Sequence, residues 1–348
     1  MQHVRAARRS VLLALTLLSA CAASEPSTEA GTGQVPPGVI SNFLAGRFAM
    51  AEGDPVTAAN DLLKAVAQSP GDPELTLQAF LACLSAGRPE AIRLAQQLPD
   101  SQVAQLVLAD VDIKAGHWQA AEQRFRGLPR QGLTQLLQPL LVAWAQLGDG
   151  RTDTALSTLR PYVENPRFQS LFSVQAAMIA DIGNRPDEAA RLYRLAEGDM
   201  TSPNLRLTQI LASWQARSGQ PGEAQRTLAS LQSVAPNLSI ALPGLLASVN
   251  KRPVARAADG IAEAYFTFAG LLRSQDANDF SLIMARLALD MRPDFAASRL
   301  LAAEILVNQQ QTQAALRMLS DVAALRDENL ITKTENKDSR PPSSKTSQ

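Results

Sequence analysis

Residues 46–70 read GRFAMAEGDPVTAANDLLKAVAQSP, and residues 212–236 read ASWQARSGQPGEAQRTLASLQSVAP. Both stretches place a small residue, then a glycine, then an alanine, and finally apolar residues and a proline at identical intervals. Apolar residues three and four positions apart lie on one face of a helix. A glycine favours the end of one helix, and a proline stops the next. Each stretch therefore predicts two helices joined by a tight turn. The residues that define the pattern are Gly46, Gly53, Ala58, Pro70, Ala212, Gly219, Ala224 and Pro236.

The same spacing recurs elsewhere in the chain. Ala109, Gly116 and Ala121 repeat it, and Ala269 and Pro293 belong to a later copy. Small side chains at these positions let the two helices of a pair approach each other closely. Glycine also supplies the positive φ that ends the first helix of a pair. We expect a positive φ at Gly53, Gly116, Gly148, Gly183 and Gly219.

These spacings resemble the tetratricopeptide repeat (TPR), a helix–turn–helix unit of about 34 residues. The resemblance implies an all-α fold, a right-handed α-solenoid of about eight units. Such units stack because one helix pair cannot bury its apolar side alone. Residues 106–113 also alternate in a strand-like way, but they occupy the first helix of the third unit, so we expect a helix there. The units are expected to start near residues 39, 73, 102, 134, 169, 205, 262 and 296.

The array is expected to contain units 1–6 over residues 39–236 and units 7–8 over residues 262–326. The insertion between them, residues 237–261, predicts a short helix that bridges the two sub-arrays. The alternative is a loop that closes over a groove and contacts a ligand. Residues 327–348 predict a disordered tail. No polar capping helix follows Val322, so we expect either a truncated array whose end is covered by a partner or the loss of a set of further units.

The first twenty residues predict an export signal. Three arginines precede the apolar run 11–18, which as a helix reaches only about 12 Å and cannot cross a bilayer core of about 30 Å. Residues 18–21 read LSAC and resemble the lipobox of bacterial lipoproteins. That resemblance implies lipidation of Cys21 after cleavage before it, followed by a flexible tether over residues 21–38.

Several features bear on the destination of the exported chain. Residue 22 is Ala22 rather than aspartate, which by analogy with lipoprotein sorting favours the outer membrane of a Gram-negative envelope, facing the periplasm. The alternative is ordinary cleavage near Ala22 or Ala23, which leaves a soluble periplasmic protein. The pair Arg8-Arg9 also leaves open a twin-arginine export route.

The composition limits the possible chemistry. The 348 residues include 33 Lys plus Arg, 33 Asp plus Glu, two His and two Cys. Removing the three arginines of the signal leaves 30 basic against 33 acidic groups, and this charge of −3 does not attract nucleic acid. No phosphate-binding, nucleophile-elbow or zinc motif occurs. We expect Cys83 to be a buried thiol and His117 to be an exposed turn residue. We therefore expect that the protein is not an enzyme and that it binds no cofactor and no metal.

The TPR resemblance implies a binding groove lined by the first helix of each unit. Cytoplasmic relatives that grip a C-terminal carboxylate use a Lys/Asn cluster, which this chain lacks. The expected function is a protein-interaction scaffold that holds an extended peptide or another envelope protein in an assembly or secretion complex. The alternative is a glycan-binding protein that assists exopolysaccharide export. The candidate groove residues are Ile40, Phe43, Arg47, Met50, Leu77, Leu81, Leu84, Arg206, Gln209, Ser213, Arg217, Phe266 and Arg273.

Overall fold

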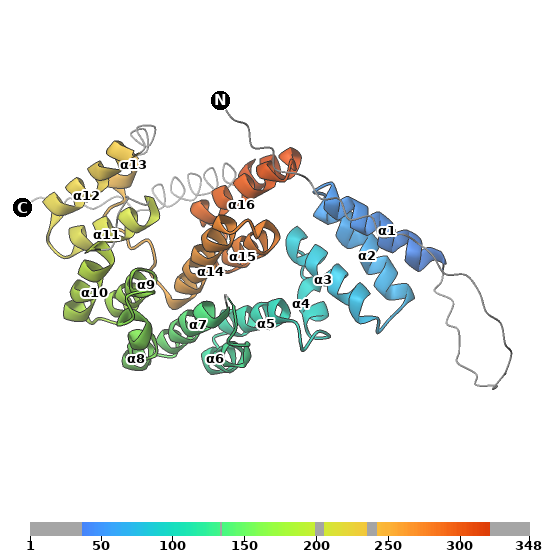
Figure 1. Cartoon of the computed structure of the whole chain (residues 1–348), viewed down its shortest axis with the longest axis horizontal. Coiled ribbons are helices and arrows are strands. Elements are labelled where there is room, and N and C mark those ends of the chain that lie inside the picture. Colours follow the sequence, from blue (N-terminus) through green and yellow to red (C-terminus); the bar gives the residue numbers. More distant parts are fainter. Residues whose placement is uncertain (1–36, 133, 199–204, 235–241, 321–348) are drawn as a thin grey trace, which may run out of the picture. The chain divides into compact units, whose positions relative to one another are not determined.

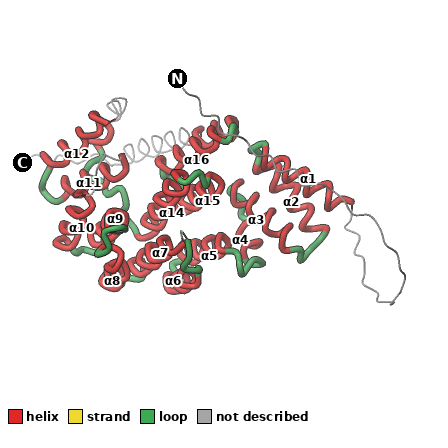
Figure 2. The backbone as a smooth tube through the Cα atoms, in the orientation of Figure 1, coloured by secondary structure: helices red, strands yellow, loops and turns green. Residues whose placement is uncertain are grey.

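The computed structural model describes residues 37–132, 134–198, 205–234 and 242–320. All regular secondary structure in these ranges is helical, and Figure 2 shows the helices joined by short loops. This confirms the all-α prediction. The predicted signal peptide, Cys21, most of the predicted tether and the predicted tail from residue 327 lie outside the described residues.

The helices pack in consecutive pairs along the chain, as expected for a TPR-like α-solenoid (Figure 1). The helices are α1 Pro37–Ala51, α2 Pro55–Gln68, α3 Pro73–Ala86, α4 Glu90–Ala95, α5 Gln102–Lys114, α6 Trp118–Gly127, α7 Thr134–Gly148, α8 Thr152–Val163, α9 Gln169–Ile182, α10 Pro186–Gly198, α11 Leu205–Arg217, α12 Pro221–Val234, α13 Leu242–Ala247, α14 Ala257–Ser274, α15 Asn278–Met291 and α16 Ala296–Asn308. Residues 312–320 are also helical and follow α16.

Local sequence fixes where these helices begin. Asp54 precedes Pro55, and its carboxylate accepts hydrogen bonds from the Thr57 backbone amide at 3.2 Å and the Thr57 hydroxyl at 2.7 Å. Asp72 caps α3 in the same way ahead of Pro73. An aspartate at the N-cap satisfies otherwise unpaired amides, and proline is tolerated in the first turn, so both helices start at these residues.

The small residues of the repeat permit close helix packing. Ala58, Ala109, Ala121, Ala212 and Ala269 are fully buried, and Ala224 is nearly so. A Cβ added at Gly46 in α1 would lie 2.5 Å from Cγ of Leu62 in α2, closer than atoms can pack. The small residues therefore set the distance between the helices of a pair. Pro70 follows α2 and Pro293 follows α15, whereas Pro236 lies outside the described residues.

The expectation of a positive φ holds at three of the five glycines. Gly53, Gly116 and Gly219 have φ of 72°, 79° and 81°. The prediction was wrong for Gly148 and Gly183, because the left-handed residues in those turns are Gly150 at 78° and Asn184 at 56°.

Gly148 and Gly183 serve a different purpose. A Cβ at Gly148 would collide with the ring of Trp118, and a Cβ at Gly183 would collide with the side chain of Thr152. Glycine is needed at both positions because another helix approaches there, and not because of the backbone conformation.

Residues 106–113 lie within α5, so the strand alternative is excluded for this segment. The insertion contains the short helix α13, whose Leu242, Leu245 and Leu246 pack against the cluster formed by α11 and α12. The next helix, α14, begins at Ala257, five residues before the expected start of unit 7. No helix among the described residues is long and apolar enough to cross a bilayer.

One feature departs from simple stacking of neighbours. The pair α14–α15 packs against first helices of much earlier units: α14 contacts α7 and α9, and α15 contacts α3 and α5 (Figure 1). The C-terminal helices are therefore held by parts of the chain that lie far earlier in the sequence.

Candidate functional site

The first helices of units 3 to 6 bind the chain's own α14, at a surface that we name the α14 interface. At its centre Gly260 of α14 lies against the indole of Trp144 of α7, and a Cβ on Gly260 would collide with that ring. Trp144 itself is fully buried. Such close packing requires glycine at position 260.

Hydrogen bonds extend the α14 interface to α9 and α5. The indole N–H of Trp144 donates to Oε1 of Gln175 at 2.8 Å, and Nε2 of Gln175 donates to the hydroxyl of Thr267 at 3.4 Å. The hydroxyl of Tyr265 donates to Oδ1 of Asp110 at 2.9 Å, and both side chains are fully buried. These polar groups satisfy one another inside an apolar interface, which makes their relative position specific.

Asp110 is the most perturbed acid in this interface. Burial raises the pKa of its carboxyl well above the ordinary value, and the Asp290 carboxylate adds to the rise, whereas the Tyr265 hydroxyl and Lys114 act against it. Within the described residues the second oxygen, Oδ2, has no hydrogen-bond partner. The environment therefore favours the protonated, neutral acid.

Arg206 connects α11 to α14 through an ion pair. Its guanidinium donates to the Glu263 carboxylate at 2.5 to 3.0 Å, and the two side chains are only 15% and 3% exposed. The guanidinium also lies 4.9 Å from the ring centre of Phe295 and donates to the carbonyl of Pro253 at 3.3 Å. Arg206 thus binds the insertion, α14 and the start of α16 together.

The insertion is held by two further polar candidates on α11, Ser213 and Arg217. Ser213 donates to the carbonyl of Lys251 at 2.8 Å. Arg217 forms two parallel hydrogen bonds with Asp181 of α9, at 3.0 and 2.6 Å, and Arg252 from the insertion reaches the same carboxylate at 3.1 Å. A ligand that used Arg206, Ser213 or Arg217 would first have to displace contacts within the chain.

The remaining candidate groove residues are distributed over several surfaces. Ile40 and Arg47 of α1 are exposed, and Arg47 lies 6.0 Å from the ring centre of Phe43. Arg273 pairs with Glu304 of α16. The others are buried or partly buried; these are Phe43, Met50, Leu77, Leu81, Leu84, Gln209 and Phe266. Their role in binding stays a prediction.

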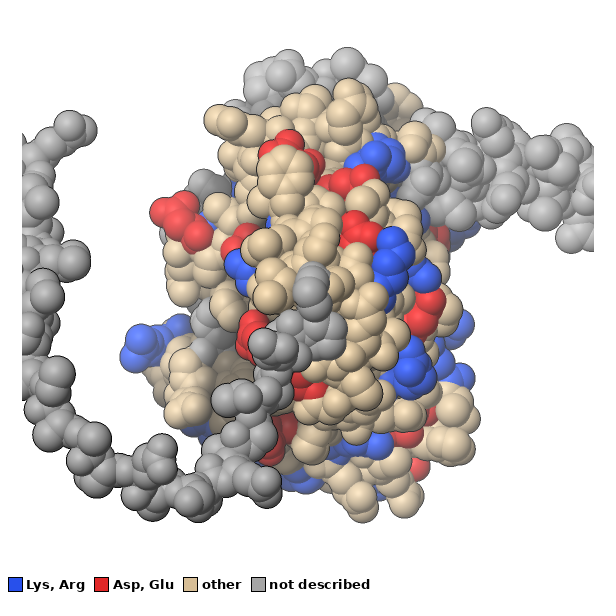
Figure 3. Space-filling model, turned by 90° about the vertical axis from the view of Figure 1, so that its right-hand side faces the viewer, with Lys and Arg blue, Asp and Glu red and all other residues tan. Residues whose placement is uncertain are grey.

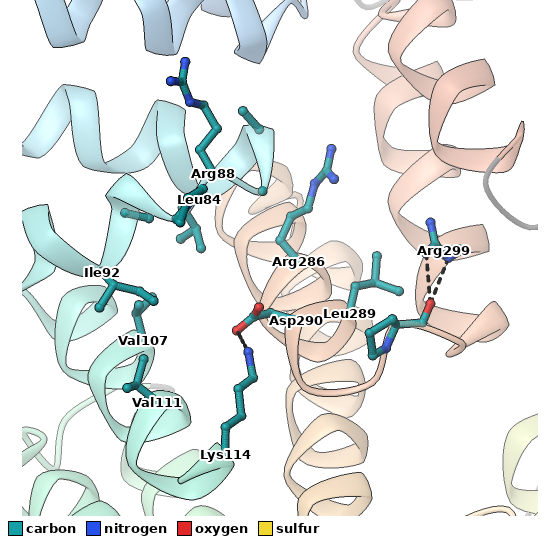
Figure 4. A pocket seen from close by; sticks show the side chains of 15 residues that line it. Leu84, Arg88, Ile92, Val107, Val111, Lys114, Arg286, Leu289, Asp290 and Arg299 are labelled. Atoms are coloured by element: carbon teal, nitrogen blue, oxygen red, sulfur yellow. Dashed lines mark hydrogen bonds and ion pairs between the residues drawn. The ribbon is translucent and has the colours of Figure 1, made fainter. Parts of the chain in front are cut away.

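The structure also contains an open cleft, away from most of the candidate groove residues. Residues of α3–α5 and of α15–α16 line a cleft of about 700 Å³, which we name the basic cleft (Figure 4). One wall carries Ile92, Val107 and Val111, and the opposite wall carries Leu289. Its volume lies in the range of ligand-binding sites in proteins, about 300 to 1,000 Å³. The basic cleft is therefore a candidate binding site in the described part of the chain.

The charged side chains of the basic cleft lie at different parts of it. The Lys114 ammonium forms an ion pair with Asp290 at 2.6 Å, which joins the two walls. Arg88 and Arg286 extend from opposite walls toward the same end, away from that ion pair (Figure 4). Arg88 pairs with Glu90 at 2.6 Å. The lining also includes Arg299, which gives four basic residues against one acidic residue, Asp290.

A second hollow, of about 360 Å³, lies near the opposite ends of α5 and α15. Its lining is apolar and includes Leu106, Phe268 and Phe280, the last of which is 58% exposed. No charged side chain lines this hollow.

Catalytic groups are sparse among the described residues. Cys83 is fully buried, and burial raises the pKa of its thiol to about 11, so the reactive thiolate is strongly disfavoured. His117 is exposed in a turn. The ranges that the structure describes contain no group of three or more His, Cys, Asp or Glu side chains that could hold a metal ion.

The surface charge in Figure 3 is mixed. Basic and acidic side chains are interspersed on the face that contains α1 and α2. This face offers no field of one sign to a polyanion.

Sequence reasoning missed both the α14 interface and the basic cleft. Gly260 had no special signature, because its need for glycine comes from Trp144, which lies 116 residues earlier. Arg286 and Ile92 also lie outside the groove positions that the TPR resemblance selects. One available signal was Asp110, a charged residue inside the otherwise apolar run 106–113.

Comparison with known proteins gives remote structural neighbours. No protein-family model and no curated protein match the chain. Among solved structures, the chain is similar to the TPR domain of P58(IPK), with 14% identity, a TM-score of 0.28 and coverage of 84% of each chain. It is also similar to a chain of the APC/C heterotetramer Cut9–Hcn1, with 12% identity, a TM-score of 0.32 and coverage of 80% of this chain and 51% of that chain. These likenesses concern the fold alone.

Proposed function

We propose that this protein is a non-enzymatic scaffold that binds another protein in the cell envelope, as part of an assembly or secretion complex. In this proposal the chain is exported, lipidated at Cys21 and held at the outer membrane, facing the periplasm. The unlipidated alternative is a soluble periplasmic protein with the same binding role.

The observation that carries the proposal is the basic cleft. It is built from two parts of the chain, residues 84–114 and residues 286–299, that are far apart in the sequence and meet across an open space. Apolar side chains on both walls offer the contact area that protein interfaces use, and charged groups at the edge offer specificity. The chemistry of a reaction is not needed to explain this arrangement.

The N-terminal segment supports the location. Apolar residues 11–18 are too short for a membrane span, and Cys21 follows closely. Lipid anchoring needs more than one acyl chain for stable attachment, and proteins with this kind of lipobox carry more than one. In this proposal the tether expected over residues 21–38 separates the anchor from the helical array.

Site-specific crosslinking in intact cells tests the proposal. A photoreactive amino acid at Ile92, which lines the basic cleft and is 37% exposed, is expected to give an adduct with one protein partner. The same amino acid at Val56, 54% exposed on α2 and outside the cleft, is the matched control and is expected to give no such adduct.

The anchor is tested in parallel. Cys21→Ala should abolish the mass of the lipid on the mature chain and release the protein from the membrane fraction. Absence of any adduct at Ile92, or equal adducts at Ile92 and Val56, would contradict the scaffold proposal. An unchanged mass and fractionation of Cys21→Ala would contradict the anchor alone.

The alternative is a glycan-binding protein in which arginines and the aromatic residues near unit 7 contact an exported polysaccharide. Two of these arginines, Arg206 and Arg217, form ion pairs within the chain, with Glu263 and Asp181, so a glycan that used them would have to displace these contacts.

A further inference from the structure

The second hollow, of about 360 Å³, differs in character from the basic cleft, and we name it the apolar hollow. Residues of α5, α7, α14 and α15 and of the loop before α7 line it. Eight of the eleven lining residues are apolar, and the other three are the uncharged Gln102, Gln131 and Thr134. Small-molecule pockets in proteins share this composition, in which apolar walls carry a few polar groups.

The deep part of the apolar hollow is formed by core side chains. Leu106, Leu137 and Phe268 line it, and each is at most 3% exposed. They also belong to the main hydrophobic core, so the hollow cannot close without disturbing that core. An apolar cavity of about 150 Å³ is enough to stay dry and bind benzene. The apolar hollow is more than twice as large and has room for a longer molecule.

Exposed groups lie where the apolar hollow meets solvent. Phe280 is 58% exposed, and Gln102 and Gln131 are exposed as well. The Thr134 hydroxyl donates to the carbonyls of Pro129 and Gln131, at 2.7 and 2.6 Å, so its proton is already engaged. The two side-chain amides both donate and accept hydrogen bonds. They can therefore bind an uncharged polar group of a ligand whose apolar part covers the Phe280 ring.

The lining also restricts the charge and the size of a ligand. No charged side chain lines the apolar hollow, so a carboxylate or an ammonium group inside it would lose hydration without gaining a partner. A leucine side chain has fewer carbon atoms than benzene and would leave more than half of the space empty. A longer aliphatic chain fills the space better than one side chain of a partner protein does.

We propose that the apolar hollow binds the aliphatic chain of an uncharged amphiphile, whose hydroxyl, ester or amide end is hydrogen-bonded by Gln102 and Gln131. The inference does not depend on the scaffold function, because the apolar hollow and the basic cleft share no lining residue.

Calorimetric titration of the purified full chain tests the inference. The chain carries Cys21→Ala, so that it has no lipid of its own, and the probes are hexan-1-ol and octan-1-ol. The affinity is expected to rise about fourfold for each added methylene. Octan-1-ol should bind about tenfold more tightly, or better, than octanoate and octylammonium. Monooctanoylglycerol and N-octylacetamide distinguish a glyceride lipid from a small fatty amide as the source of the chain, and binding of either supports the inference.

Matched variants locate the binding site. Phe280→Ser removes the exposed ring, and Val103→Trp fills the apolar hollow with a larger side chain. Both should weaken octan-1-ol binding about fivefold or more. Phe48→Ser removes a 68%-exposed phenylalanine of α1, outside the hollow, and should bind octan-1-ol as the wild type does. Thermal melting shows whether each variant is folded, and Phe280→Ser is decisive if Val103→Trp melts early.

Four results would overturn the inference. These are no binding of octan-1-ol, equal affinity for hexan-1-ol and octan-1-ol, equally tight binding of octanoate or octylammonium, and wild-type binding by folded Phe280→Ser. Binding of N-acetylleucine amide as tight as that of octan-1-ol would also contradict it and would assign the apolar hollow to a side chain of a partner protein. The crosslinking experiment at Ile92 is independent of all these outcomes.

Discussion

The helix pair α14–α15 meets the first part of the array in two regions of opposite character. At the α14 interface, Gly260 packs on Trp144 and polar side chains are paired in buried positions. At the basic cleft, α15 contacts α3 and α5 but leaves about 700 Å³ of open space beside them, and the partly exposed Lys114–Asp290 ion pair joins the two walls. The comparison indicates that α14 holds the pair in place, and that α15 thereby becomes the second wall of a binding site.

The largest expected effect comes from breaking the ion pair between α11 and α14. Arg206→Ala leaves the Glu263 carboxylate, which is 3% exposed, without its main partner. Removing one member of a buried pair costs about 3 kcal/mol or more. Urea unfolding should show this loss in the free energy of unfolding. Arg226→Ala, which removes a 74%-exposed arginine on α12, is the control and should change it by less than about 0.5 kcal/mol. Equal effects of the two variants would mean that the α14 interface contributes little.

A smaller but more specific effect is expected at the centre of the α14 interface. Gly260→Ala places a methyl group against the indole of Trp144, and overpacking of this kind costs about 1 to 3 kcal/mol. Gly270→Ala is the matched control, because it lies on the same helix and its Cβ would meet no atom within 4 Å. That control should be stabilised by about 0.5 to 1 kcal/mol through helix propensity. The two alanines should therefore shift the melting temperature in opposite directions, and a stabilising Gly260→Ala would refute the close packing of α14 on Trp144.

The buried acid of the α14 interface predicts that the stability of the fold depends on pH. Because the folded protein raises the pKa of Asp110 above 3.8, the folded state retains the proton longer than the unfolded state. The contribution of Asp110 to stability is therefore complete below about pH 4 and is lost as the pH rises toward the raised value.

Asp110→Asn keeps the acceptor for the Tyr265 hydroxyl but cannot ionise. The variant should be more stable than the wild type near neutral pH, and this advantage should shrink as the solution is made acidic. Urea unfolding of both proteins at several pH values measures this difference in the free energy of unfolding. An advantage of Asp110→Asn that stayed constant with pH would show that folding does not raise the pKa of Asp110.

The smallest effect is expected in the basic cleft. Lys114 and Asp290 are 44% and 48% exposed, so their ion pair is screened by water and salt. Lys114→Ala should lower the free energy of unfolding by less than about 1 kcal/mol, and less at high salt. A loss as large as that of Arg206→Ala would mean that α15, and not α14, holds the helix pair.

The sequence was sufficient for the local fold. The spacing of Gly53, Ala58 and Leu62 predicted helix pairs, because the contacts that it encodes lie within one pair. The expected starts near residues 73, 102 and 134 coincide with the starts of α3, α5 and α7. Short-range periodicity carries this information directly.

The sequence was insufficient for contacts between distant units. Arg206 and Ser213 were assigned to a binding groove, yet both contact residues that follow them by 38 to 57 positions. The packing of Gly260 on Trp144 depends on the three-dimensional arrangement of α14 and α7, and no periodic pattern in the sequence predicts it. The basic cleft is formed by the docking of α14 and α15, which no local pattern encodes.

A double-mutant cycle on Arg206 and Glu263 tests most directly whether α14 is bound by the first part of its own chain. The free energy of unfolding is measured for the wild type, Arg206→Ala, Glu263→Gln and the double variant. With α14 docked on α11, the two residues should show a coupling energy above about 1.5 kcal/mol, because their side chains touch across 57 positions of sequence. A coupling energy near zero would show that α14 lies elsewhere, and the basic cleft would then lose its second wall.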